Sequence, residues 1–460
     1  MTRTTDYRVV IWLVGLTQLV MTTDFSILTV ALPSIGRGFH LSPASLAWVI
    51  TAAALPTAGL LTLAGRAADL FGQRRCMLIG LTLFGGGSLV AAFAPSLPVL
   101  IGGRALQGLG GVILSPANFS LINTLVPEGA PRRQALGVFG VMQGLSLVIG
   151  LLLGGFLTTQ FGWRSVFLIN PPIAALAIFL TWWAVPMAKQ KLDRSVDFLG
   201  GALITVAAGA TIAALSFVGR LGVSVISVGL ATLGIAAFVA FFVVESRVKS
   251  PLVPLSIFGR RNFIPANLVG GCLLAGVGGT FVLTSLFMQN GLRFSARDSG
   301  LGMMPYAAAV MLAGQVAPWL MGRFPNRRII TSGMALYGAG VALLAVFQGQ
   351  GSYLLALAPW SVMCAFGSTV AFMALMAEAT ADVPAEQQGV ASAVIFTGQG
   401  ICLPLGLTLA MSQLGGAGGF SSAYGALAIV LAFGCLLSLL TLRAAAKPGD
   451  PLAVQPIPAV

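Results

Sequence analysis

Charged residues are scarce in this 460-residue chain, where they make up only 8% of the sequence while 57% of it is hydrophobic. Ordinary soluble domains carry about 25% charged residues. The mean hydropathy is correspondingly high, at +0.95. Such a small number of charges cannot cover the surface of a water-soluble globule. The composition therefore excludes a soluble protein and indicates that lipid surrounds the chain.

Residues that commonly carry catalysis are also scarce. The only histidine, His40, falls in a short polar loop, and the five cysteines lie in or beside apolar runs without metal-type spacing. The sequence has no phosphate-binding Gly-Lys loop and no sizeable soluble segment, which argues against a membrane enzyme and against ATP-driven transport. A channel would show a repeated pore segment or rings of charge. We therefore expect a transporter with no metal site and no cofactor.

Long apolar runs, in contrast, fill the chain. They are continuous rather than alternating, which disfavours a β-barrel and indicates an all-α integral membrane protein. If about 20 apolar residues make one crossing, the sequence predicts fourteen transmembrane helices: 9–32, 46–64, 76–94, 98–124, 134–158, 165–186, 198–218, 222–244, 264–288, 298–321, 327–348, 352–376, 387–412 and 421–443.

The Lys and Arg residues predict the orientation of these helices, because basic residues concentrate in cytoplasmic loops. With the amino terminus inside, only five of the 25 fall in outer loops: Arg37, Arg164, Arg220, Arg293 and Arg297. Arg104 lies within the fourth span, and the other nineteen fall on the inner side. This bias predicts a multi-pass protein of the cell membrane with both termini cytoplasmic. It also explains the basic composition without nucleic-acid binding.

Two polar stretches divide the chain. They are "KQKLDRSVD" (189–197) and "ESRVKSPLVPLSIFGRR" (245–261). The sequence "FGQRR" (71–75) follows the second span, and the similar "FPNRR" (324–328) follows the tenth, as a duplicated six-helix half would give. We predict an N-terminal six-helix bundle (1–186), a linker with two inserted helices (187–263), a C-terminal six-helix bundle (264–443) and a disordered cytoplasmic tail (444–460).

Asp24 is the one acidic residue of twelve that lies well inside a predicted crossing. A carboxylate there costs a few kcal/mol and usually serves function, although a structural hydrogen bond between helices is the alternative. At 1.5 Å per residue, Asp24 lies about 14 Å below the outer face and Arg104 about 9 Å below it, with Gln107 level with Asp24. Because a buried charge needs a partner, we predict that Asp24 and Arg104 interact directly or through water.

This setting suits reversible protonation. Burial disfavours the charged carboxylate, the guanidinium favours it, and movement of the bundle would change the balance. The membrane potential supplies about 2.3 kcal/mol per charge per 100 mV. The pair therefore predicts a carrier that uses the proton gradient as its energy source.

Several stretches resemble the major facilitator superfamily, and specifically its fourteen-span drug–proton antiporter branch of EmrB/QacA-like multidrug efflux transporters. These stretches are "TDFSILTVALPSI" (23–35), "GRAADLFGQRR" (65–75), "RALQGLGG" (104–111), "FGWRSVFLINPPIA" (161–174) and "PLVPLSIFGRRNF" (251–263). The resemblance implies two pseudo-symmetric bundles plus two linker helices, and export by alternating access. It implies proton coupling at Asp24 and Arg104. It also implies a conformational latch at Gly65, Asp69, Gly72, Arg74 and Arg75, for which a plain basic hairpin is the alternative.

The fifth span carries small residues at helix-packing spacing. They are Gly137, Ser146, Gly150, Gly154 and Gly155. The row departs from the family's pattern, because Leu151 stands where proline is usual and Ser146 where glycine is usual.

Candidates for the substrate cavity are residues on the helical face of Asp24 and polar residues in or near spans. They are Thr17, Met21, Leu28, Gln107, Asn118, Gln143, Gln289, Tyr306, Gln315 and Gln399. An ordinary interhelical hydrogen bond is the alternative for each. The expected partners are the lipid bilayer, protons and a small amphipathic or cationic compound such as a drug, an antibiotic or a toxic metabolite. We expect a monomer, and uptake or uniport of a metabolite is the alternative function.

Overall fold

The computed structural model describes residues 7–127, 129–187, 198–248, 255–350, 352–381, 383, 388–416 and 418–442, and the predicted tail at 444–460 lies outside them. The helices in these ranges are α1 (Tyr7–Phe39), α2 (Pro43–Phe71), α3 (Gln73–Ala92), α4 (Leu97–Leu125), α5 (Ala130–Phe161), α6 (Ser165–Leu168), α7 (Asn170–Ala184), α8 (Phe198–Leu221), α9 (Val225–Glu245), η1 (Leu255–Gly259), α10 (Phe263–Leu286), η2 (Phe287–Gly291), α11 (Ala296–Gly302), α12 (Met304–Arg323), α13 (Asn326–Phe347), η3 (Gln348–Gln350), α14 (Tyr353–Ala356), α15 (Ala358–Thr380), α16 (Gln388–Leu414) and α17 (Gly419–Thr441). In this part of the chain, twelve helical segments are long and apolar enough to cross a membrane. The protein is therefore an all-helical multi-pass membrane protein.

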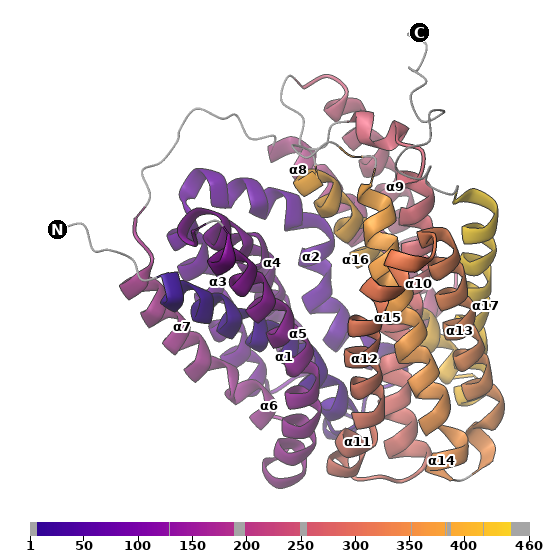
Figure 1. Cartoon of the computed structure of the whole chain (residues 1–460). Coiled ribbons are helices and arrows are strands. Elements are labelled where there is room, and N and C mark those ends of the chain that lie inside the picture. The colour runs from indigo at the N-terminus through magenta and orange to yellow at the C-terminus, as the bar shows by residue number, and fades with distance from the viewer. Residues whose placement is uncertain are drawn as a thin grey trace.

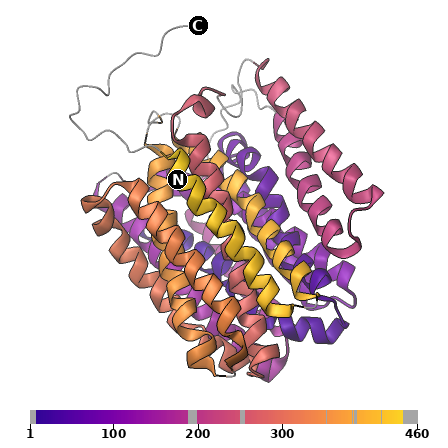
Figure 2. The ribbon, with the colours of Figure 1, turned by 90° about the vertical axis from the view of Figure 1, so that its right-hand side faces the viewer.

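The helices form two bundles and a hairpin that packs against α2 and α16. Helices α1–α7 make one bundle and α10–α17 the other (Figure 1), while α8 and α9, in pink, stand together at one edge (Figure 2). Gly222, with φ of 70°, and the capping residue Ser224 form the tight turn between α8 and α9. A glycine suits this turn because it adopts positive φ at little cost. We call the bundles the N-half and the C-half, and the pair α8–α9 the hairpin.

Two predicted spans differ in detail from the helices. Helix α1 continues through Pro33 to Phe39, although the apolar run ends near that proline. Hydrophobicity marks the membrane boundary, whereas backbone hydrogen bonding can extend the helix beyond it. The sixth predicted span is broken into α6 and α7, and prolines begin α7, where the missing backbone N–H does little harm.

Equivalent arginines link the third helix of each half to its last helix. Arg74, at the start of α3, donates a hydrogen bond from Nη2 to the Trp182 carbonyl of α7 at 2.8 Å. Arg327, at the start of α13, donates from Nη2 to the Leu439 carbonyl of α17 at 2.6 Å. Each arginine belongs to one of the two similar "RR" stretches, so each half joins its third helix to its last in the same way. This correspondence is what a duplicated six-helix half predicts.

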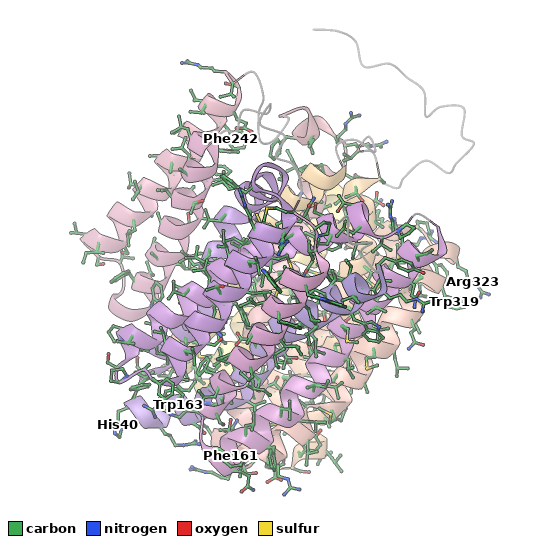
Figure 3. All side chains as sticks on the ribbon, turned by 90° about the vertical axis from the view of Figure 1, so that its left-hand side faces the viewer. His40, Phe161, Trp163, Phe242, Trp319 and Arg323 are labelled. Atoms are coloured by element: carbon green, nitrogen blue, oxygen red, sulfur yellow. The ribbon has the colours of Figure 1, made fainter. Side chains whose placement is uncertain are left out.

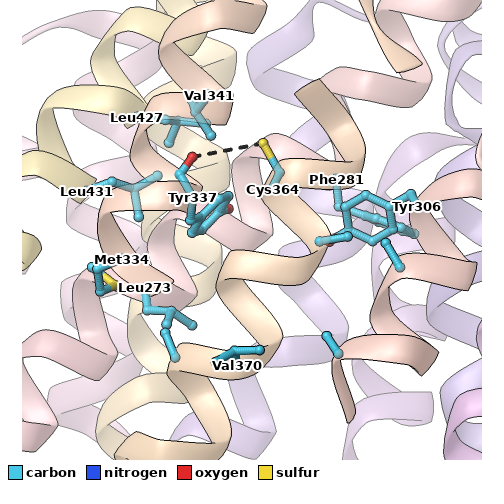
Figure 4. Packing of buried hydrophobic residues seen from close by; sticks show 14 of the residues in the cluster. Leu273, Phe281, Tyr306, Met334, Tyr337, Val341, Cys364, Val370, Leu427 and Leu431 are labelled. Atoms are coloured by element: carbon cyan, nitrogen blue, oxygen red, sulfur yellow. Dashed lines mark hydrogen bonds between the residues drawn. The ribbon is translucent and has the colours of Figure 1, made fainter. Parts of the chain in front are cut away.

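The core of the C-half around Tyr337 and Cys364 is apolar with neutral polar groups. Figure 4 shows Tyr337, Cys364 and Tyr306 among buried aliphatic side chains. The Tyr337 hydroxyl donates to Thr280 Oγ1 at 3.2 Å, and Cys364 Sγ donates weakly to the Tyr337 carbonyl at 4.0 Å. Buried hydroxyls with partners stabilise such a core without adding charge.

Two cation–π pairs of arginine and tryptophan lie near helix ends. The Arg164 guanidinium lies 4.2 Å from the centroid of the Trp163 ring, and Arg323 lies equally close to Trp319. Figure 3 shows Trp163 with His40 and Phe161 at the lower end of the molecule, which is the predicted outer end. Tryptophan and arginine are enriched where helices leave the hydrocarbon.

The two halves touch directly at this outer end. Ser285 Oγ of α10 donates to the Thr29 carbonyl of α1 at 3.1 Å, and Gln289 Nε2 donates to the Val30 carbonyl at 2.9 Å. Beside them, the Cα of Gly155 on α5 lies so close to α11 that a Cβ there would come within 2.8 Å of the Ala296 carbonyl oxygen. The outer ends of the halves are therefore joined by backbone contacts that leave no space for side chains.

Close packing of α3 on α4 gives a direct test of the fold. A Cβ at Gly103 would lie 2.7 Å from the Ala91 backbone nitrogen, whereas a Cβ at the adjacent Gly102 meets nothing within 4 Å. We expect Gly103→Leu to lower the free energy of unfolding by about 1–3 kcal/mol or more, as overpacking does, and Gly102→Leu to leave it nearly unchanged. Thermal unfolding of the two variants in detergent would measure the difference, and equal midpoints would contradict the packing.

Candidate functional site

The carboxylate of Asp24 is the centre of a buried polar network inside the N-half. Its Oδ2 accepts a hydrogen bond from Arg104 Nη1 at 2.5 Å, which is also an ion pair. Its Oδ1 accepts from Gln107 Nε2 at 3.0 Å and from Asn170 Nδ2 at 2.8 Å. The predicted contact between Asp24 and Arg104 is confirmed, and it is direct.

Arg104 is held in place from several sides. Besides Asp24, its Nη1 donates to Gln107 Oε1 at 2.8 Å and its Nε donates to the Val49 carbonyl of α2 at 2.9 Å. Its guanidinium carbon lies 5.9 Å from the centroid of the Phe167 ring, within the range of a cation–π interaction. With 2% of Arg104 and 5% of Asp24 exposed, both charges are withdrawn from solvent and neutralise each other.

Two residues of the network, Asn170 and Ser88, had no role in the sequence-based prediction. Ser88 Oγ of α3 accepts hydrogen bonds from Gln107 Nε2 at 2.7 Å and Asn170 Nδ2 at 3.3 Å, and donates to the Phe84 carbonyl at 2.8 Å. Asn170 begins α7, directly before two prolines. Its place in "FLINPPIA", within a stretch already linked to the family, was the available signal.

The network combines one charged pair with neutral partners. Three of its members, Ser88, Gln107 and Asn170, are neutral groups. The carboxylate of Asp24 is stabilised by one guanidinium and two amide donors. The arrangement is therefore complementary to a negative charge at this position.

Part of the predicted latch lies within the described residues. Gly72, with φ of 84°, joins α2 to α3, and Arg75 is exposed at the predicted inner end. Arg74 makes the contact with Trp182, inside its own half. The surroundings of Gly65 and the side chain of Asp69 lie outside the described part of the structure. The latch between the halves therefore stays a prediction.

The small residues of the fifth span pack mainly against α1. A Cβ at Gly150 would collide with Ser26 Oγ, and one at Gly154 would lie 2.8 Å from the Ile27 carbonyl. The Ser146 carbonyl accepts a hydrogen bond from Ser26 Oγ at 3.1 Å. Gly137 meets nothing within 4 Å. Helix α5 runs unbroken to Phe161, as expected with Leu151 in place of a proline.

The cavity candidates fall into different environments. Thr17 and Met21 line a small apolar cavity inside the N-half, and Leu28 is fully buried in the core. Asn118 accepts from Thr17, Gln289 bonds α1, and Tyr306 packs against Phe281 with ring centroids 5.4 Å apart. Gln143 and Gln315 are exposed. Gln399 is buried, and its amide has no partner among the described residues. Contact with a substrate stays a prediction for all ten.

The face of α1 that contacts the C-half is not the face that carries Asp24. Phe25 stacks on Phe281 of α10, with ring centroids 5.8 Å apart and planes 18° apart. Helical register places Gln18 and Thr22 on the same side as Phe25, and Gln18 Nε2 donates to Thr22 Oγ1 at 3.0 Å. All three are half-buried. The sequence analysis missed this face because it followed the side of Asp24.

Comparison with known proteins identifies the family. The sequence profile of the Major Facilitator Superfamily matches residues 14–407. The chain is 31% identical over 404 residues to the multidrug resistance protein Stp of Mycobacterium tuberculosis, covering 87% of this chain and 74% of that protein. It is 33% identical over 401 residues to the puromycin resistance protein pur8 of Streptomyces alboniger, covering 85% and 78%. It is also 32% identical over 459 residues to the cephamycin export protein CmcT of Amycolatopsis lactamdurans, covering 94% and 92%.

Solved structures share the fold at low sequence identity. A crystal structure of the peptide transporter POT in complex with sulfate gives a TM-score of 0.69 at 16% identity, covering 94% of this chain and 93% of that one. A crystal structure of the nucleoside transporter NupG gives a TM-score of 0.66 at 12% identity, covering 94% and 100%.

The buried ion pair can be tested by a double-mutant cycle. Removing one partner of such a pair typically costs about 3–5 kcal/mol, because the other charge stays buried and unpaired. We therefore expect Asp24→Asn and Arg104→Gln to lower the free energy of unfolding individually, and the double variant to lose clearly less than the sum. Thermal or denaturant unfolding of the purified proteins measures the coupling. Strictly additive losses would show that the two charges do not stabilise each other.

Proposed function

Because the chain belongs to the Major Facilitator Superfamily, we propose that it is a proton-coupled exporter of amphipathic or cationic organic compounds. The family assigns it to the membrane transporters rather than to the enzymes. The names of its relatives refer to multidrug resistance, puromycin resistance and cephamycin export. These names support export of drugs or antibiotics, by alternating access between the two halves.

The buried Asp24–Arg104 pair is the observation that carries the proposal. Both members of this ion pair are buried, and the sequence predicts that they lie well inside the membrane. An intramembrane acid held by one base and neutral amides suits a proton site. Proton binding to Asp24 from outside would weaken the hold of Arg104 and favour the arrangement that releases the substrate.

The contacts between the halves support the starting state of this cycle. They include the bonds from Ser285 and Gln289 of α10 to carbonyls of α1 at the predicted outer end. The arrangement is closed on the outer side, so a compound would enter from the inner side. Rocking of the halves would break these contacts and expose the site outward.

The finer topology belongs to the same proposal. Twelve described helices are long and apolar enough to cross a membrane, and α2 and α8 add two candidates with 29 and 24 residues. At 1.5 Å per residue these two helices extend about 43 and 36 Å, which exceeds the hydrocarbon thickness of about 30 Å. We infer fourteen crossings in the cell membrane, with both termini cytoplasmic because of the inward bias of Lys and Arg.

Energised membrane vesicles test the proposal. We expect Asp24→Asn to abolish efflux of a cationic dye such as ethidium driven by a proton gradient, because the carboxyl can no longer change charge. Asp298→Asn is the matched control, since Asp298 is exposed at the start of α11, and it should transport normally. Growth tests with puromycin and ethidium show which compounds the protein protects against.

Unchanged efflux by the Asp24→Asn variant would overturn proton coupling at this site. Efflux that persists in the unaltered protein after a protonophore collapses the gradient would favour uniport, the alternative mechanism.

A further inference from the structure

The Asp24 carboxylate points into the N-half and away from the other half. Its partners come from α4 and α7. The next residue, Phe25, faces α10 and stacks on Phe281, and the Thr29 carbonyl also faces α10. At 3.6 residues per turn, Phe25 and Thr29 lie about 100° and 140° around the helix from Asp24. The backbone of α1 therefore stands between the carboxylate and the interface between the halves.

A small cavity lies directly beside the network, inside the same half. It is lined by residues of α1, α3, α4 and α7, the four helices that supply the network's side chains. Val20, Phe84 and Ala174 line it, and each lies four residues from a network member: Asp24, Ser88 and Asn170 respectively. Given the predicted direction of each helix, all three steps lead toward the cytoplasm, so the cavity lies about one helical turn from the network on its predicted inner side.

A buried polar pair lies beside the cavity. Thr17 is one of the lining residues, and Thr17 Oγ1 lies 2.9 Å from Asn118 Oδ1, to which it can donate. Asn118 is fully buried, and its Nδ2 has no hydrogen-bond partner among the described residues. An unpaired buried N–H is costly, and water is its usual partner. This position therefore points to a place where water enters the N-half.

We propose that protons pass between Asp24 and the cytoplasm through the interior of the N-half, by way of this cavity and the Thr17–Asn118 pair. The inference rests on the proposed proton coupling at Asp24, and it separates the path of the proton from the substrate path between the halves. Thr17 lies seven residues from Asp24, or about 10 Å at 1.5 Å per residue, so water would have to enter transiently between them.

The transfer conserves charge at each step. The protonated Asp24 carboxyl gives its proton to an adjacent water and becomes the carboxylate that pairs with Arg104. Each water passes one proton onward, and the Thr17 hydroxyl accepts a proton on its oxygen while releasing its own to water on the inner side. The rest of the lining is apolar, and apolar cavities of this kind stay dry on average. Hydration is therefore transient, which limits leakage of protons.

Variants in this route test the proposal. Substrate contact is the other prediction for Thr17 and Asn118, and ethidium exchange at equal pH distinguishes the two roles. Thr17→Val and Asn118→Leu remove the polar groups while nearly preserving volume, and Ala177→Leu fills the cavity. Matched controls are Thr124→Val on α4 and Ala175→Leu on α7, where the side chains are exposed. The full-length protein in liposomes containing a pH-sensitive dye would report proton release together with ethidium transport. Ethidium exchange at equal pH on both sides would be measured in parallel.

We expect the three route variants to slow gradient-driven ethidium transport and proton release at least about tenfold, equivalent to about 1.4 kcal/mol of barrier, while exchange at equal pH stays near the level of the controls. Normal gradient-driven transport in Thr17→Val and Asn118→Leu would overturn the route, as would an equal loss of exchange. These two variants decide the test if Ala177→Leu fails to fold.

Asp24→Asn separates this inference from the proposed function. If that variant loses gradient-driven transport while the route variants keep it, only the route is wrong. If it keeps gradient-driven transport, proton coupling at Asp24 is wrong.

Discussion

The pairing of one carboxylate with one guanidinium in an apolar bundle is the constraint on which the N-half depends. Neither charge could stay buried alone. Each unused acceptor of Asp24 is therefore matched by an amide, and Arg104 is fixed by the Val49 carbonyl as well. Helices α4 and α7 supply the partners of Asp24 and α2 supplies the carbonyl that binds Arg104, so the pair links α1, α2, α4 and α7.

The two halves share the same helix packing but differ in the residues at their centres. Gly87 approaches the Gly103 carbonyl and the Gln107 backbone nitrogen, and Gly340 approaches the Trp360 carbonyl and the Cys364 nitrogen in the same way. Cys364 thus occupies the place that Gln107 has in the network. Around Cys364, the described residues of the C-half contribute tyrosine hydroxyls. The buried acid of this half, Glu378, lies near the C-terminal end of α15 and accepts hydrogen bonds from Asn262 and Asn326. The same helix packing therefore surrounds an ion pair in one half and neutral groups in the other.

The sequence was sufficient for much of the fold and for the ion pair. Because a helix must cross the hydrocarbon layer, long apolar runs locate the spans. The rise of 1.5 Å per residue then gives the depth of each residue in the membrane, and the similar depths of Asp24 and Arg104 predicted their contact. Ser88 and Asn170 could not be found in this way, because neutral polar residues are common in spans and their partners depend on helix rotation. The orientation of α1 was missed for the same reason: depth is encoded in the sequence, but the neighbour across each face is set by tertiary packing.

The arginine contacts that close each half have a mechanical consequence. Arg74 and Arg327 join the third helix of each half to its last helix by a side-chain hydrogen bond. Such links stiffen a half against sliding of its own helices. In the proposed transport cycle each half would then move as one stiff unit, and the displacement would fall on the contacts near Thr29 and Gly155.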